Sequence, residues 1–311
     1  MRIKMIIKMV VALAALGVAS QGAIAGELTG TLEKIRRSGS ITIGNRESSI
    51  PFSYYDSNEK VVGYAMDLCT LAADAVKVSL GLPKLDIKLV PVTPSTRIPS
   101  VLNGTVDLEC GTTTNNLERE KVVSFSITYF VAANRFLAKT AAQLRTLDDL
   151  KGKTVVSTIG STNLRQISEL DEQRHLGLTI LAAKDNGEAF RMLESDRADA
   201  FVMDDILLYS RVADTPVPTD YTISDEALSV EPYGIMLRRD DPAFKKVVDD
   251  AMSELYRSGE IQKIYAKWFL APVAPNAVNL NVPMSASLKR VIAHPTDSGD
   301  PEAYLTGNKT Q

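Results

Sequence analysis

The 311-residue sequence is poor in the residues that most often carry metal or covalent chemistry: it has two cysteines, two histidines and one tryptophan. His175 and His294 lie far apart, and Cys69 and Cys110 do not form a CxxC pair. The signatures HExxH, GxSxG, the P-loop and GxGxxG are also missing from the sequence. We therefore expect no metal, no cofactor and no catalytic residue.

Positive charge is not in excess either, because 35 lysines and arginines face 38 acidic residues for a net charge of −3. Removing residues 1–25 takes away Arg2, Lys4 and Lys8 and no acid, which leaves a net charge of about −6. A mildly acidic protein is poorly suited to nucleic acid or to anionic membranes. After residue 25, no apolar run approaches the ~20 residues that a membrane span needs.

Residues 1–25 have the pattern of a secretory signal peptide: a basic start, an apolar middle and the small residues Ala23-Ile24-Ala25. We expect cleavage before Gly26 and a soluble mature protein in the periplasm. That compartment is oxidising, so Cys69 and Cys110 either form a disulfide or remain two buried free thiols. The sequence leaves both alternatives open.

Predicted strands alternate with predicted helices along the mature chain. This alternation is typical of an α/β protein whose mostly parallel sheets are covered by helices on both faces. The predicted strands are 40–44, 52–55, 60–64, 85–92, 105–109, 154–158, 178–182 and 198–203, and the predicted helices are 28–38, 66–80, 95–103, 163–172, 187–195, 242–258, 260–269 and 285–292.

Two extended segments, 129–138 and 228–237, are long enough to cross between two lobes. We therefore predict one lobe from residues 26–134 plus 230–311 and a second, inserted lobe from residues 135–229. The polar tail after His294 is expected to be peripheral.

A polar turn follows the strand at 105–109, in the stretch Cys110-Gly111-Thr112-Thr113-Thr114-Asn115-Asn116-Leu117-Glu118-Arg119. A strand that ends in a glycine and three threonines before a helix presents hydroxyls and backbone N–H groups at one point. The dipole of the new helix would favour an anion there. Arg119, one turn further on, can hold a carboxylate bidentately.

Other polar groups also follow strand ends, where ligands bind in sheets of this kind. Arg119 and the helix start at Ser161-Thr162 suit an α-carboxylate, and Asp204 with the hydroxyls of Thr112 and Thr114 suits an α-ammonium group. Asp205 is the alternative acid, and each of these residues also has an ordinary structural role open to it.

Arg46 and Arg97 remain without a partner in this arrangement, apart from Glu47, which could neutralise part of their charge. Burying two guanidinium groups without a counter-charge is costly. This surplus of positive charge favours a ligand with an acidic side chain.

Four stretches resemble the bacterial periplasmic glutamate/aspartate-binding proteins, the solute receptors of ABC importers within solute-binding protein family 3. They are Gly44-Asn45-Arg46-Glu47-Ser48-Ser49, Thr96-Arg97-Ile98-Pro99, the polar turn from Cys110 to Arg119, and Phe201-Val202-Met203-Asp204-Asp205. The resemblance covers roughly residues 28–293. It implies the two-lobe type II periplasmic binding protein fold, with two hinge strands, a ligand cleft between the lobes and docking onto a membrane permease.

The resemblance implies the α-carboxylate for Arg119 with Thr162, the α-amino group for Asp204, Thr112 and Thr114, and the side-chain carboxylate for Arg46 and Arg97. Pro94 and Asn186 stand where similar members often have serine and histidine, so glutamate, aspartate and a larger acidic ligand all stay open. The full set of expected ligand-binding residues is Arg46, Arg97, Thr112, Thr114, Arg119, Ser161, Thr162, Asn186 and Asp204.

The sequence therefore predicts a monomeric, non-catalytic receptor for glutamate or aspartate that delivers its ligand to an ABC permease. One alternative is an enzyme similar to the periplasmic cyclohexadienyl dehydratases, in which Glu47 or Asp185 would act as the acid. Another is a receptor for a different polar amino acid or a dicarboxylate.

Overall fold

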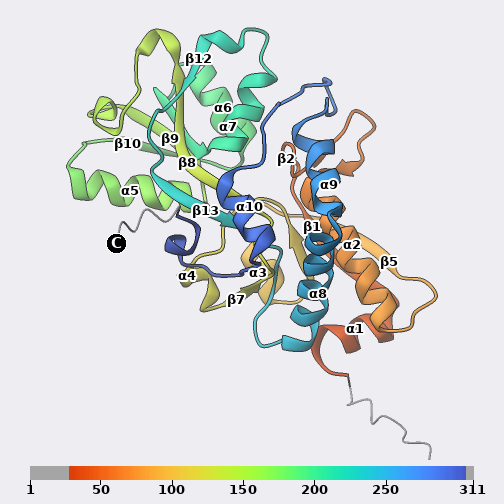
Figure 1. The fold of residues 1–311 in the computed structure, drawn as a ribbon. Coiled ribbons are helices and arrows are strands. Elements are labelled where there is room, and N and C mark those ends of the chain that lie inside the picture. Colours follow the sequence, from red (N-terminus) through yellow and green to blue (C-terminus); the bar gives the residue numbers. More distant parts are fainter. Residues whose placement is uncertain (1–27, 306–311) are drawn as a thin grey trace, which may run out of the picture.

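A computed structural model describes residues 28–305 as two α/β lobes, each built around its own sheet (Figure 1). This confirms the predicted α/β class. The expected signal peptide, residues 1–25, lies outside the described residues. No helix between residues 28 and 305 combines the length and the apolar content that a membrane crossing requires.

The first lobe holds a five-stranded sheet with the order β5 (Asp86–Pro91), β1 (Ser40–Asn45), β6 (Leu108–Cys110), β14 (Met236–Arg238) and β7 (Val123–Phe125). Strand β1 runs parallel to β5 and β6, while β14 returns from the C-terminal part of the chain and runs antiparallel to β6 and β7. A small antiparallel sheet consists of β2 (Ser48–Ser49), β3 (Ser53–Tyr55) and β4 (Val61–Val62). The helices of this lobe are α1 (Gly30–Ser38), α2 (Tyr64–Ser79), α3 (Arg97–Leu102), α4 (Leu117–Glu120), α8 (Pro242–Ser258), α9 (Glu260–Phe269) and α10 (Ala286–Ala293).

The second lobe holds a sheet with the order β10 (Thr179–Ala183), β9 (Thr154–Thr158), β11 (Ala200–Asp204), β8 (Phe130–Lys139) and β12 (Tyr221–Ile223), and β13 (Ser229–Tyr233) also pairs with β8. Its helices are α5 (Thr162–Arg174), α6 (Asn186–Glu194) and α7 (Asp205–Ala213). Strands β9, β10 and β11 are parallel, so their carboxyl ends lie at the same edge of the sheet. That edge faces the first lobe, and α5 begins there, separated from the end of β9 by three residues.

The chain crosses between the lobes twice. The predicted single segment 228–237 is in fact two strands, because β13 pairs with β8 in the second lobe and β14 belongs to the sheet of the first. The two crossings are joined where Tyr129 N donates to Tyr233 O over 2.9 Å. The predicted lobe boundaries, 26–134 plus 230–311 and 135–229, fall inside β8 and β13 and stay a prediction.

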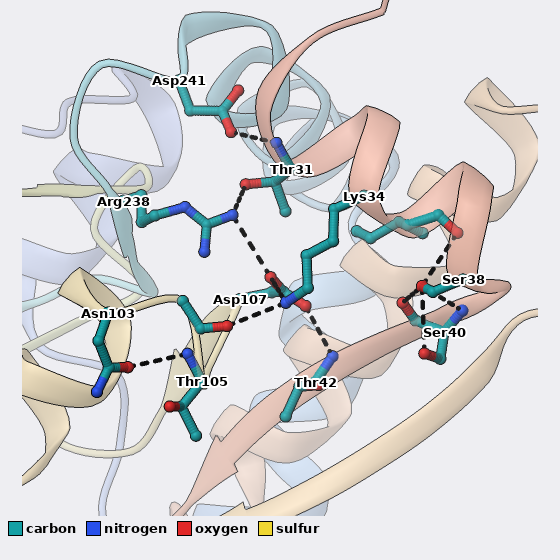
Figure 2. Close-up of polar contacts among 12 residues, drawn as sticks. Thr31, Lys34, Ser38, Ser40, Thr42, Asn103, Thr105, Asp107, Arg238 and Asp241 are labelled. Carbon is teal, nitrogen blue, oxygen red and sulfur yellow. Dashed lines mark hydrogen bonds and ion pairs between the residues drawn. The ribbon is translucent and has the colours of Figure 1, made fainter.

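A buried ion-pair cluster fixes the base of the first lobe (Figure 2). The Asp107 carboxylate, just before β6, accepts from Lys34 Nζ at 2.8 Å and from Thr42 N at 3.0 Å. Arg238 at the end of β14 lies 3.6 Å from the same carboxylate and also donates to the hydroxyl of Thr31. The cluster joins α1, β1, β6 and β14, and the carboxyl ends of β1 and β6 lead into the cavity described below.

Cys69 on α2 and Cys110 at the end of β6 form a disulfide, with their Cα atoms 6.3 Å apart. The alternative of two free thiols is therefore wrong. The bond ties the helix to the strand immediately before the polar turn. It holds that turn against the core of the first lobe.

The tail after His294 is not peripheral, because it packs against the segments that connect the lobes. Thr128 N donates to Thr296 O over 2.9 Å, and Asn115 Nδ2 donates to Asp297 O over 2.7 Å. The Tyr304 hydroxyl is buried 2.8 Å from Thr128 Oγ1. The tail therefore supports the polar turn and the first crossing from behind.

Candidate functional site

A narrow cavity with a free volume of about 10 Å³ lies between the two lobes. It brings together all the predicted binding residues except Arg119, namely Arg46, Arg97, Thr112, Thr114, Ser161, Thr162, Asn186 and Asp204. The remaining lining residues are Pro94, Thr158, Asn163 and Met203. Residues from six strand ends thus meet in one place, as the strand-end argument predicts. Their roles stay a prediction.

The polar turn of the first lobe is buried from Cys110 to Asn115, whereas Leu117 and Glu118 are exposed. Asn116 caps the next helix by accepting from Arg119 N over 2.9 Å. This helix, α4, has only four residues, so its dipole gives little support to the expected anion site, which stays a prediction. The turn instead contributes its threonines and the Arg119 side chain.

Arg119 lies beside the cavity and bridges the two lobes. Its guanidinium donates to Thr114 O at 2.8 Å in its own lobe and to Gly160 O at 3.3 Å in the other. Burial, followed by the positive charge of Arg97, lowers the pKa of Arg119 to about 9, so the side chain stays charged near neutral pH. Arg119 therefore links the closed lobes while it keeps a cation next to Ser161 and Thr162.

Arg46 and Arg97 both line the cavity and are almost fully buried. Arg97 donates to Thr112 O at 3.2 Å and to Thr113 Oγ1 at 2.7 Å, while its Nε has no hydrogen-bond partner among the described residues. Burial and the adjacent Arg97 cation lower the pKa of Arg46 to about 10. The two guanidinium groups are adjacent, and the buried Nε–H group of Arg97 lacks an acceptor within residues 28–305. Both features favour the binding of an anionic ligand.

Glu109 is a buried acid beneath these arginines that the sequence argument missed. Its side chain is 0 % exposed, and its Oε2 accepts from Thr113 Oγ1 over 2.5 Å. The sequence contains a sign of this role: Glu109 is an acidic residue in a predicted strand, and a carboxylate buried in a strand needs a buried partner. The prediction that Glu47 neutralises the arginines is unsupported, since Glu47 is exposed and does not line the cavity.

Asp204 at the end of β11 presents a buried carboxylate to the cavity. One oxygen accepts from Asn163 Nδ2 at 2.7 Å, and the other accepts from the Tyr233 hydroxyl. Burial, followed by the negative charge of Glu231, raises the pKa of Asp204 to about 7. Asp205, the alternative acid, lies outside the cavity and accepts from Ala133 N instead.

A second buried acid, Glu231 on β13, was also missed by the sequence argument. It accepts from Thr162 Oγ1 at 2.8 Å and from Gln166 Nε2 at 2.7 Å. It thereby ties the second crossing strand to the start of α5. Thr162 in turn lies 3.4 Å from Thr114 across the cleft, measured between the two Oγ1 atoms.

The second lobe closes the cavity with its helix starts. Ser161 caps α5 by accepting from Leu164 N over 3.1 Å, and Thr158 Oγ1 donates to Asn186 Oδ1 over 3.1 Å. Thr158 thus orients the Asn186 amide through its oxygen, and the NH₂ group of the amide can donate to a ligand in the cavity. Gly160 packs so closely on Pro94 that a methyl group at position 160 would lie 2.8 Å from the Pro94 carbonyl oxygen.

The cavity therefore has two parts of opposite charge. The Arg46–Arg97 part holds two cations over the single Glu109 carboxylate, and the Asp204 part offers an acid. The surplus of guanidinium is smaller than the sequence indicates, because Glu109 and Glu231 offset part of it. A zwitterion with an additional carboxylate matches both parts at once.

The chain is similar to known proteins over most of its length. Residues 41–271 match the model of the family described as "Bacterial extracellular solute-binding proteins, family 3". The L-glutamate/L-aspartate-binding protein of Pseudomonas aeruginosa is 50% identical over 275 residues, which are 88% of this chain and 91% of that protein. The glutamate/aspartate import solute-binding protein of Escherichia coli is 45% identical over 86% of this chain and 88% of that protein.

Solved structures with the same fold include the P235GK mutant of ArgBP from T. maritima, with a TM-score of 0.69 and 30% identity over 77% of this chain and 99% of that one. Another is the ancestral amino acid-binding protein AncCDT-1, a precursor of cyclohexadienyl dehydratase, with a TM-score of 0.65 and 27% identity over 77% of this chain and 99% of that one. These similarities agree with the two-lobe architecture and with the cleft between the sheets. The chain belongs to the bacterial extracellular solute-binding proteins of family 3.

Proposed function

We propose that the protein is a periplasmic receptor that binds glutamate or aspartate and delivers it, as a monomer, to the membrane permease of an ABC importer. In this proposal Arg119, Ser161 and Thr162 hold the α-carboxylate. Asp204, Thr112 and Thr114 hold the α-ammonium group. Arg46, Arg97 and Asn186 hold the side-chain carboxylate.

The observation that carries the proposal is the pair of buried arginines in the interlobe cavity, one of which retains a donor without a protein partner. Leaving a buried charged donor unpaired is unfavourable by roughly 1–3 kcal/mol or more. A ligand carboxylate removes this penalty, whereas an amide offers one acceptor and no charge. The names of the relatives from P. aeruginosa and E. coli support the same ligand class.

The competing dehydratase function has less support. Neither Glu47 nor Asp185 lines the cavity, and the lining acid is Asp204. Asp185 instead caps α6 by accepting from Glu188 N over 2.8 Å. In the proposed complex Asp204 is engaged by the ligand's ammonium group, so we infer that the protein binds its ligand without converting it.

The first prediction concerns Arg97→Ala, which should separate acidic from neutral ligands. We expect the affinity for glutamate to fall about 100-fold, because truncating one member of a buried charge pair typically costs 2–5 kcal/mol. The weak affinity for glutamine should change less than threefold. Titration calorimetry with both ligands on both proteins measures the two ratios. Unchanged glutamate affinity would show that the side-chain carboxylate lies elsewhere.

The second prediction is a loss of affinity at low pH. The raised pKa of Asp204 means that the unliganded site holds a proton below about pH 7, and a ligand ammonium must displace it. We expect glutamate affinity to fall by up to about tenfold per pH unit below 7. Calorimetry at pH 5.5, 7.0 and 8.5 measures this, with glutarate as the control because it lacks the ammonium group. Equal glutamate affinity at pH 5.5 and 8.5 would contradict the role of Asp204.

The same group contributes to stability with the opposite dependence on pH. Its folded pKa of about 7 lies above its ordinary value of 3.8, so its contribution is complete below pH 3.8 and is lost as the pH rises through about 7. Because the ligand ammonium displaces the proton of Asp204, ligand binding near neutral pH should release protons. Repeating the titrations in buffers of different ionisation enthalpy detects that release.

A further inference from the structure

Glu109 has no assigned role, although it lies directly beneath the two arginines of the cavity. Its carboxylate is fully buried in β6, the central strand of the first sheet. Oε2 accepts from the Thr113 hydroxyl, while Oε1 has no hydrogen-bond partner among residues 28–305. A buried carboxylate with a free oxygen needs a nearby cation.

The surrounding contacts bring Glu109 close to both arginines. Thr113 Oγ1 accepts a hydrogen bond from Arg97 Nη1 at 2.7 Å and donates one to Glu109 Oε2, so the hydroxyl connects the two charged groups. A methyl group at position 111 would lie 2.7 Å from Glu109 Oε1 and 2.7 Å from Arg46 Cγ. Gly111 thus leaves the space in which the Arg46 stem and the Glu109 carboxylate approach each other.

From this geometry we propose that Glu109 is a specificity-determining residue: its buried carboxylate neutralises one of the two cations at Arg46 and Arg97 and so matches the site to a singly charged ligand side chain. The proposal rests on the function proposed above and adds to it the charge of the ligand. Glu109 does not touch the ligand and acts through Thr113 and the two arginines.

The charge arithmetic gives the expected selectivity. Among the buried groups, two guanidinium groups and the Glu109 carboxylate leave a net charge of +1, which one ligand carboxylate balances. Asp185 also attracts Arg46, but its side chain is 33% exposed and solvent screens its charge. A side chain of charge −2 would leave an excess of negative charge in a buried site, and a neutral side chain would leave the cation unpaired. Replacing Glu109 with glutamine raises the net charge to +2 and keeps an oxygen that can accept from Thr113.

The third prediction follows from this change of charge. At pH 7.5 we compare glutamine, glutamate and O-phospho-L-serine, whose side chains carry charges of about 0, −1 and −2. In Glu109→Gln, the affinity for O-phospho-L-serine relative to glutamate should rise at least tenfold over the wild-type ratio. Comparing the two proteins cancels the difference in ligand size.

Glu47→Gln is the matched control, because Glu47 is an exposed acid next to Arg46 in the sequence. Its ratio should stay within twofold of the wild type. If Glu109→Gln does not fold, the wild-type protein tests the same charge match. It should bind glutamate at least tenfold more tightly than glutamine and O-phospho-L-serine, and O-phospho-L-serine binding as tight as that of glutamate would overturn the proposal.

The outcomes separate this inference from the proposed function. Wild-type protein that fails to bind glutamate overturns the proposed function itself. Wild-type protein that binds glutamate, with a ratio in Glu109→Gln that stays within twofold or with no binding of O-phospho-L-serine to the variant, overturns only the role of Glu109. An equal loss of affinity for all three ligands would show a merely structural role and also overturns it.

Discussion

The Arg119→Ala variant should lose affinity for glutamate and for glutamine alike, by about 1000-fold. The mutation removes the guanidinium that is proposed to hold the α-carboxylate, a group that every amino acid shares. It also removes the hydrogen bond to Gly160 O that links the closed lobes. Loss of a buried, charge-assisted contact is expected to cost several kcal/mol, and each 1.4 kcal/mol is a factor of ten in affinity.

Arg165→Ala is the control for this variant. Arg165 lies in the same neighbouring cavity as Arg119, but its side chain is 48% exposed and pairs only loosely with Glu169 at 3.8 Å. Its removal should change affinity less than threefold. If Arg119→Ala bound glutamate as the wild type does, the α-carboxylate would have to be held elsewhere.

Gly160→Ala should block closure of the lobes and lower glutamate affinity at least 100-fold. The new methyl group would lie 2.7 Å from Ser95 Cα and 2.8 Å from Pro94 O, which are backbone atoms that cannot rotate away. Calorimetry gives the affinity. Small-angle X-ray scattering should show that saturating glutamate no longer makes the variant more compact.

Gly152→Ala separates this clash from backbone strain. Gly152 also has a positive φ of 68°, against 79° for Gly160, but a methyl group there meets nothing within 4 Å. Both variants should lose about 1–2 kcal/mol of stability, because a residue with a side chain is disfavoured at positive φ. Only Gly160→Ala should lose affinity. Wild-type affinity in Gly160→Ala would show that the Pro94–Gly160 contact is not part of the bound form.

Much of the fold could be predicted because the chain marks its elements clearly. Helices α8 and α9 match their predicted ranges, with Pro242 at the start of the first and Gly259 in the left-handed conformation between the two. Strand β9 also matches, since its valines are flanked by a turn on each side. Helix α7 was not predicted, because the predicted strand ended at residue 203 and no helix was assigned to the residues after Asp205.

Site residues that follow strand ends could be predicted from the sequence. Site residues whose role depends on packing between distant segments could not. Arg46 follows β1, Arg97 begins the helix after β5 and Asp204 ends β11, and parallel strands place such residues at a common edge. Glu109 and Glu231 lie within strands, and their role depends on which strands flank them. The sequence does not show which strands these are, because β14 pairs with β6 and β8 pairs with β13 across large separations along the chain.

The most direct test of the account compares L-glutamate with L-glutamine by titration calorimetry on the wild-type protein at pH 7.5. The two ligands differ mainly in the charge of the side chain, so the comparison isolates the Arg46–Arg97 part of the cavity. We expect glutamate to bind at least 100-fold more tightly than glutamine. Equal affinities, or tighter binding of glutamine, would contradict it.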